Sequence, residues 1–312
     1  MSRVLTVPLP SLRGSLTSSP IFRKCKPYLF LLPALLPLIL FIFAPLVRSL
    51  YLSMLSWNMV SPNPEWVGFA NYQELLTSEE FWKSTVNTLK YAGCLLVFLL
   101  VLPFITAYSV TRVPIRVQNF YKTALFVPHV LSLAVASAIF LWLFNPVVGV
   151  LNELLSLVNI SAINWLSSPT WALFSVSLIV AWNTFGYHFI ILLAGILAVP
   201  GEIVESARLE GMKRHLGLLR RIIIPLCGPT LLFVFIMTVV MGIQFAFVPV
   251  QMLTNGGPNQ ETTHLVFLTY QYGFQFFRSG LASATAILTF GLFLILIIVQ
   301  ALLLDRRVHY EN

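Results

Sequence analysis

Long apolar stretches constrain this chain more than any other feature of its sequence. Each of six stretches can form a helix that crosses the ~30 Å hydrocarbon layer of a bilayer, at a rise of ~1.5 Å per residue. A helix in lipid satisfies its own backbone hydrogen bonds, so we expect an all-α polytopic membrane protein with about six transmembrane helices. The expected spans are residues 28–52, 85–110, 124–144, 171–199, 225–248 and 282–304.

The composition agrees with a membrane-embedded chain. Hydrophobic residues make up 58% of it and charged residues 10%, whereas an ordinary soluble domain has about 25% charged residues. The formal net charge is +8, but the basic residues lie in short segments between the apolar stretches. They form no patch interleaved with aromatic residues, so we expect membrane lipid and not nucleic acid around this chain.

The distribution of basic residues predicts the orientation in the membrane. Of the 19 lysines and arginines, all but Arg48, Lys83, Lys90 and Arg278 fall on one alternating set of segments, which includes both chain ends. Short cytoplasmic loops carry such an excess of lysine and arginine. We therefore expect a multi-pass protein of the bacterial inner membrane with both termini in the cytoplasm.

Several functional classes lack the residues that they need. No Asp or Glu lies within an expected span, whereas ion-coupled carriers commonly use intramembrane carboxylates. An ion-coupled secondary carrier is therefore the weaker alternative. The spans contain no paired carboxylates, histidine cluster or serine motif that would indicate a membrane-embedded enzyme. Cys25, Cys94 and Cys227 are isolated, so we expect neither a metal site nor catalytic residues.

The segment between the fourth and fifth spans predicts a short helix on the inner side. Pro200 suits a first helical position, and Glu202 complements the positive end of the helix dipole. Gly211 can adopt the left-handed conformation that ends a helix. Basic and apolar residues then alternate as far as Pro225. Such a segment can dock a soluble partner, or lie on anionic lipid as an interfacial amphipathic helix.

This segment resembles the EAA motif of permease subunits of binding-protein-dependent ATP-binding-cassette importers. That pattern is E-A-A-x3-G, nine variable residues, then I-x-L-P. The matching residues here are Glu205, Ser206, Ala207, Gly211 and Pro225. Serine stands at the second position, and ten residues separate Gly211 from Ile222 instead of nine. One extra residue would turn a continuous helix by ~100°.

Three further stretches resemble the carbohydrate-uptake branch of this family, typified by maltose and glycerol-3-phosphate permeases. They lie in the first outer loop, at the end of the third span and in the last outer loop. Together they extend the resemblance over nearly the whole chain from about residue 28. The stretches are WVGFANY at residues 66–72, LWLFNP at 141–146, and NGGP at 255–258 with Thr262 and Thr263.

The resemblance implies a type I importer fold and a set of partners. The partners would be a second homologous permease, two ATP-binding subunits docked on the EAA loops, and an extracytoplasmic solute-binding protein. Residues 205–211 would form the coupling helix that transmits ATPase closure to the spans during alternating access. The chain contains no GxxxxGK[ST] phosphate loop. We therefore expect a transport subunit without a cofactor of its own, with ATP and magnesium bound by the ATPase partners.

These expectations divide the chain into four segments. The first is a cytoplasmic segment at residues 1–27, and the second is the first transmembrane helix with its outer loop at residues 28–84. A core permease domain follows at residues 85–304, with the EAA coupling loop at residues 200–224. The last segment is a cytoplasmic tail at residues 305–312.

Polar residues within the spans are candidates for the substrate pathway. Asn183 and Tyr187 share one helical face, His188 is adjacent, and Gln244 lies in the fifth span. Hydrogen bonding between helices is the alternative role for all four. No Lys or Arg lies at mid-depth, and this favours a neutral glycoside or polyol. A phosphate ester such as glycerol-3-phosphate is the alternative substrate class.

Overall fold

The computed structural model of the chain describes residues 31–212 and 215–305. The expected cytoplasmic segment at residues 1–27, the start of the first span and most of the tail lie outside these residues. The chain divides into two compact units, Met1–Tyr51 and Leu52–Asn312. We expected the outer loop up to residue 84 to belong with the first span, whereas the second unit includes that loop from Leu52 onward.

The first unit contains the first expected span. This span is helical over Leu31–Leu52, and its last residue already belongs to the second unit. A π-helical turn, η1 (Ile39–Phe43), leads into α2 (Ala44–Leu52).

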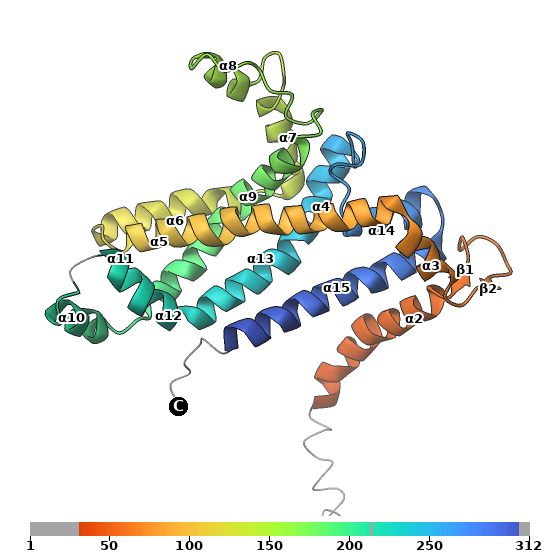
Figure 1. Ribbon diagram of the computed structural model, residues 1–312, viewed down its shortest axis with the longest axis horizontal. Coiled ribbons are helices and arrows are strands. Elements are labelled where there is room, and N and C mark those ends of the chain that lie inside the picture. Colours follow the sequence, from red (N-terminus) through yellow and green to blue (C-terminus); the bar gives the residue numbers. More distant parts are fainter. Residues whose placement is uncertain (1–30, 213–214, 306–312) are drawn as a thin grey trace, which may run out of the picture. The chain divides into compact units, whose positions relative to one another are not determined.

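The second unit contains the remaining spans, and α9 lies at its centre. Helix α9 (Ala172–Leu197) packs against α4 (Glu79–Leu96), α5 (Leu102–Val110) and α13 (Gly228–Pro249). Figure 1 shows these long helices side by side with α15 (Ser279–Asp305). Within the described residues, five helices are long and apolar enough to cross a membrane. A bent helix pair supplies a sixth span if it is counted as one.

The expectation of one continuous helix over residues 124–144 is wrong. Helices α6 (Ile115–Val130) and α7 (Leu133–Leu143) meet there at an angle of 96°. Pro128 lacks the N–H of a regular helical bond, and Leu131 and Ser132 are extended. The Ser132 hydroxyl then accepts a hydrogen bond from Val135 N at 3.3 Å and starts the new helix.

Single π-helical turns interrupt several helices. They widen one turn so that it holds an extra residue. The turn η3 (Leu219–Ile223) lies between α11 (His215–Leu218) and α12 (Ile224–Leu226). This is the stretch in which the sequence has one residue more than the EAA pattern. A π turn takes up one residue more than a regular turn, so α11, η3 and α12 do not form the regular helix for which a ~100° rotation was expected. The other turns in the second unit are η2 (Val97–Val101), η4 (Val250–Thr254) and η5 (Gln271–Gln275).

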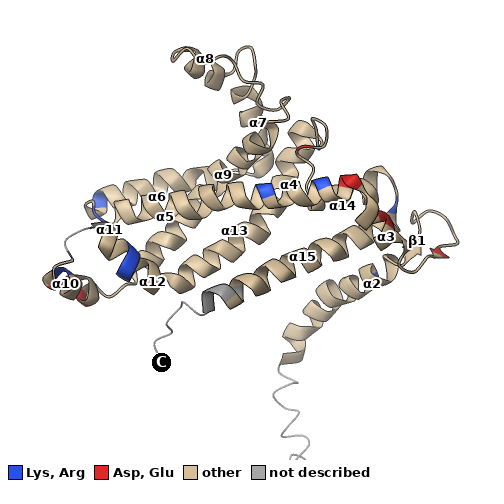
Figure 2. Ribbon diagram, viewed as in Figure 1, with Lys and Arg blue, Asp and Glu red and all other residues tan. Residues whose placement is uncertain are grey.

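Short elements connect the long helices. On the side that we expect to be outside, strands β1 (Leu55–Ser56) and β2 (Glu65–Trp66) pair antiparallel. Figure 2 shows that charged residues gather toward the ends of the long helices, with few along their middle parts. The remaining short helices are α3 (Ala70–Thr77), α8 (Val150–Ser156), α10 (Gly201–Leu209) and α14 (Leu265–Tyr270).

Candidate functional site: the inner helix and the bent span

Helix α10 has the ends that the sequence predicts, with a shift of one residue at its start. Pro200 is the N-cap, so the first helical residue is Gly201. At the other end, Gly211 has a φ of +93°. Gly211 N donates to Arg208 O at 3.2 Å and Met212 N donates to Ala207 O at 3.0 Å. These two bonds form a Schellman motif, so the predicted left-handed helix end at Gly211 is confirmed.

The two faces of α10 differ in exposure. Ala207 is buried and packs, together with Val204, into a hydrophobic cluster at the ends of α5 and α9. A separate stripe of α10 at three-residue spacing is exposed, with Ile203 38% exposed, Ser206 exposed and Leu209 90% exposed. An apolar outward face on a short helix offers a soluble partner a surface to bury.

The remaining EAA residues are also accessible. The side chains of Glu205 and Pro225 are exposed, and Pro225 lies in the first turn of α12. Because α12 continues directly from the π turn η3, Pro225 lies where the regular helical hydrogen-bond pattern is already interrupted.

The bend between α6 and α7 depends on Asn183 of α9. Its side-chain amide donates to Pro128 O at 2.9 Å and to Leu131 O at 3.0 Å. A bend inside a membrane leaves backbone carbonyls that some other group must satisfy. Both amide hydrogens of Asn183 therefore hold the bend. This is the hydrogen bonding between helices that was the alternative to a role in the substrate pathway.

A glycine allows α9 to approach α6 closely at the same level. A Cβ atom at Gly186 would overlap the backbone carbonyl of Leu125 and lie 2.7 Å from the Cα of Phe126. Small residues permit such close helix packing in membranes. Gly186 and Asn183 thus fix the inner part of the bent span against the central helix.

An aromatic and imidazole cluster lies next to this contact. Tyr187 stacks on His129 with ring centroids 5.2 Å apart, and it meets His188 edge to face. The Nδ1 atom of His188 lies 3.0 Å from Thr184 O. Among the described residues, Nδ1 of His129 and Nε2 of His188 have no hydrogen-bond partner. The cluster thus places two buried, unpaired imidazole nitrogens beside the contact between α6 and α9.

Gln244 lies on another helix. Its side chain is exposed on α13, and no hydrogen bond to another described residue is found. An exposed amide at this depth is costly in contact with lipid. A neighbouring subunit or a water-filled pathway would satisfy it.

The sequence reasoning did not find a polar contact between α4 and the loop that contains NGGP. Asn87 donates to Gln260 O at 2.9 Å and to Thr263 O at 3.0 Å. Leu265 N donates to the Thr88 hydroxyl at 3.0 Å. Burial lowers the pKa of the nearby His264 to about 3, so this imidazole is neutral at neutral pH. A row of polar residues along one face of α4 was the available signal: Ser84, Asn87, Thr88 and Tyr91.

The WVGFANY stretch forms a joint between β1 and the start of α15. Asn71 donates to Ser53 O at 2.8 Å and to Leu55 O at 2.9 Å. Ser279 N donates to Trp57 O at 2.9 Å. A Cβ atom at Gly280 would overlap the Leu55 carbonyl, so the first turn of α15 lies directly against this strand.

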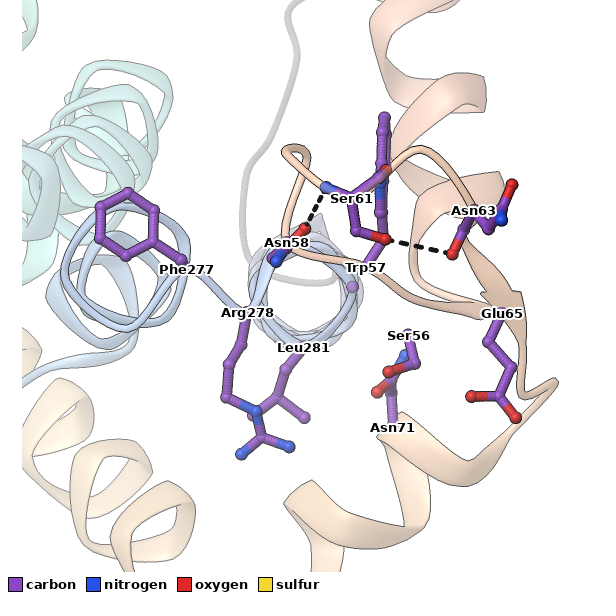
Figure 3. A pocket seen from close by; sticks show the side chains of 11 residues that line it. Ser56, Trp57, Asn58, Ser61, Asn63, Glu65, Asn71, Phe277, Arg278 and Leu281 are labelled. Carbon is purple, nitrogen blue, oxygen red and sulfur yellow. Dashed lines mark hydrogen bonds between the residues drawn. The ribbon is translucent and has the colours of Figure 1, made fainter.

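A pocket of about 350 Å³ beside this joint has a mostly polar lining (Figure 3). Its polar groups are largely engaged within the protein. Trp57 Nε1 donates to Ser61 O at 2.7 Å, and Arg278 forms a two-pronged ion pair with Glu74 at 2.7 Å. Because these polar groups bond to one another, the pocket results from the way in which the loop is held, and we do not assign a ligand to it.

A comparison with known families decides the identity of the chain. Residues 99–310 match the model of the family described as "Binding-protein-dependent transport system inner membrane component". The chain belongs to this family. It is a multi-pass inner-membrane permease subunit of an ATP-binding-cassette importer, and the family expected from the sequence is confirmed. The permease is a non-catalytic transport subunit, and ATP is bound by a partner ATPase.

Curated relatives align over most of their length with this permease. It is 31% identical over 273 residues to the sulfoquinovosyl glycerol transport system permease protein SmoG of Agrobacterium fabrum, covering 85% of each chain. It is 28% identical over 292 residues to the sn-glycerol-3-phosphate transport system permease protein UgpA of the same organism. That alignment covers 92% of this chain and 97% of the relative.

A solved structure has the same fold. The chain superposes with a TM-score of 0.78 on a chain of a bacterial importer of the acidic polysaccharide alginate. The alignment has 23% sequence identity and covers 92% of this chain and 99% of the other. The polytopic all-α fold expected from the sequence is confirmed.

Proposed function

We propose that this permease moves a sugar or sugar-like solute across the inner membrane by alternating access, with α10 as the coupling helix. The observation that carries this proposal is the geometry of α10. One face of the helix packs on the ends of two spans, while Ile203 and Leu209 are exposed and do not belong to that packed cluster. An ATPase that covers the outward face would move the spans through the packed face.

The proposed assembly contains three kinds of partner. One is a second homologous permease, which would also cover the exposed amide of Gln244 on α13. The others are two ATP-binding subunits at the EAA segments and an extracytoplasmic solute-binding protein. A related alginate importer was solved together with a periplasmic protein that holds an alginate pentasaccharide, which supports the last partner.

We further propose that both termini are cytoplasmic, because the basic residues lie on the corresponding segments. A cysteine placed at the exposed Glu210 should then be protected from an impermeant thiol reagent in cells with a permeabilised outer membrane. A cysteine at the exposed Asn63, in the outer hairpin, should be labelled. Both variants are made in a chain whose three native cysteines are replaced. The reverse labelling pattern would overturn the orientation.

The solute class has two candidates. Among the described residues, the middle parts of the spans contain imidazoles, amides and aromatic rings but neither Lys nor Arg. A sugar phosphate carries about two negative charges at neutral pH, and moving them through a low-dielectric path without a cation is costly. This favours a neutral glycoside or polyol. The names of the relatives favour a phosphate ester or an acidic sugar.

Stimulation of ATP hydrolysis distinguishes the two classes. The permease is reconstituted with its partner subunits and with a panel of candidate solute-binding proteins. We expect a neutral glycoside or polyol to stimulate hydrolysis. Gln244→Ala should weaken the response about fivefold, the effect of losing one hydrogen bond worth ~1 kcal/mol. Gln300→Ala is the matched control, because Gln300 donates to Leu232 O at 3.3 Å within the protein. Stimulation by sugar phosphates alone would contradict the neutral class and leave the importer class intact.

A further inference from the structure

A second pocket lies against the inner face of α10. Its volume is about 530 Å³, within the ~300–1,000 Å³ range of ligand sites. It is formed by the ends of α5 and α9, by one side of α10, and by Leu218 and Ile223 at the end of α11 and in η3. The residues that carry the argument are Arg112, Ile196, Val204, Glu205, Arg208 and Ile223.

The apolar part of this pocket belongs to a packed hydrophobic cluster. Ile196, Leu218 and Ile223 are buried members of it, and Val204 packs against them. Ile196 lies in the last turn of α9, at the end of a membrane span. The apolar wall is therefore at the level where hydrocarbon gives way to lipid headgroups.

The polar part contains two guanidinium groups. The side chains of Arg112 and Arg208 are exposed, and the Arg112 guanidinium lies 4.1 Å from the centre of the Tyr108 ring. Neither arginine forms a salt bridge with another described residue, whereas Arg278 on the other side is fully paired. The Glu205 carboxylate also lines the pocket, which leaves a positive balance among the charges that the structure describes there.

The pocket is separate from the face that we assign to the ATPase. The α10 residues that line it are Gly201, Val204, Glu205 and Arg208, at the spacing that places residues on one side of a helix. Ile203 and Leu209 do not line it. A ligand in the pocket would touch the coupling helix from the membrane side while a partner covers the outward face.

We propose that this pocket binds the headgroup of an anionic phospholipid. Arginine forms forked, charge-assisted hydrogen bonds with phosphate oxygens. Basic pockets between transmembrane helices on the cytoplasmic side suit anionic headgroups. The acyl chains would cover Leu197, which lines the pocket and is 55% exposed, whereas a soluble anion would leave it in contact with water. A lipid bound here braces α10 against the ends of the spans.

Lipid retention by the purified full-length chain tests this proposal without any transport measurement. The chain is delipidated in detergent and incubated with phosphatidylglycerol or phosphatidylcholine, and bound lipid is counted by native mass spectrometry. We expect phosphatidylglycerol to be retained at least tenfold better than phosphatidylcholine. The double variant Arg112→Gln/Arg208→Gln should remove most of this preference. The matched control is Arg116→Gln/Arg220→Gln, which changes two exposed arginines outside the pocket.

Three results would overturn the proposal. One is unchanged retention of phosphatidylglycerol by the pocket variant, and another is equal retention of the two lipids by the unmodified chain. The third is full displacement of the lipid by millimolar inorganic phosphate, which would indicate a site for a soluble anion. Helical circular dichroism and gel-filtration elution confirm that both variants are folded. None of these results bears on the importer assignment.

Discussion

Gly211→Val is expected to abolish ATP-dependent uptake, whereas Gly211→Asn retains most of it. The reason is the left-handed backbone at this position, where φ is +93°. A β-branched residue is strained there, at a cost of ~1–2 kcal/mol, while asparagine adopts such a conformation readily. No heavy atom lies within 4 Å of a Cβ built on Gly211, so crowding within the chain does not explain the difference. With valine the Schellman bonds would be lost and the end of α10 would unwind.

Uptake is measured with the full set of partner subunits, and the amount of permease in the membrane is measured by immunoblotting. Normal uptake by the valine variant at normal abundance would contradict the proposed coupling role of α10. Equal loss of uptake with asparagine and valine would indicate that Gly211 contacts the ATPase directly. In that case the backbone argument fails while the docking site remains.

Gly186→Ala is expected to lower the thermal stability of the folded permease, whereas Gly93→Ala leaves it unchanged. Both glycines lie inside long helices, so the intrinsic gain in helix propensity is the same, ~1 kcal/mol. At Gly93 a Cβ meets no atom within 4 Å, but at Gly186 it would overlap the Leu125 carbonyl. The overlap involves backbone and cannot be relieved by rotating a side chain. We expect a cost of at least about 2 kcal/mol through separation of α6 from α9.

The measurement is the temperature at which the detergent-solubilised protein loses its monodisperse gel-filtration peak. The alanine at position 93 provides the baseline. If the Gly186→Ala protein is as stable as the Gly93→Ala protein, α6 and α9 do not pack as closely as described. The assignment of Asn183 to the bend would then also fail, because its two hydrogen bonds depend on the same approach.

The sequence predicts the spans well, because the length of an apolar stretch is tied directly to bilayer thickness. It does not predict the 96° bend between α6 and α7. Proline is common in unbroken transmembrane helices, so Pro128 alone gives no signal for a break. The bend also needs Asn183, which lies more than fifty residues away in sequence. A distant partner of this kind cannot be read from local periodicity.

The same limit applies to the candidate site. The sequence predicts that Gly211 ends α10, because a glycine directly after a short helix can adopt the left-handed conformation that ends it. Asn183 was a candidate for the substrate pathway. The sequence alone does not distinguish a polar side chain that contacts a solute from one that bonds to a neighbouring backbone. The Tyr187 and His129 stack joins two helices. This stack depends on the close approach of α6 and α9 at Gly186. The sequence shows a glycine at this position but does not indicate the approach.

The π turn at Leu219–Ile223 separates the length of a helical segment from the direction of the side chains that follow it. In an unbroken α-helix these two properties change together. In a regular helix, a change of one residue in length redirects every later side chain. A π turn takes up one residue more than a regular turn, so the residues after it keep the direction that they would have in a helix one residue shorter. A connection built in this way tolerates a change of one residue in its length without a change in the direction of the fifth span, which begins at Gly228.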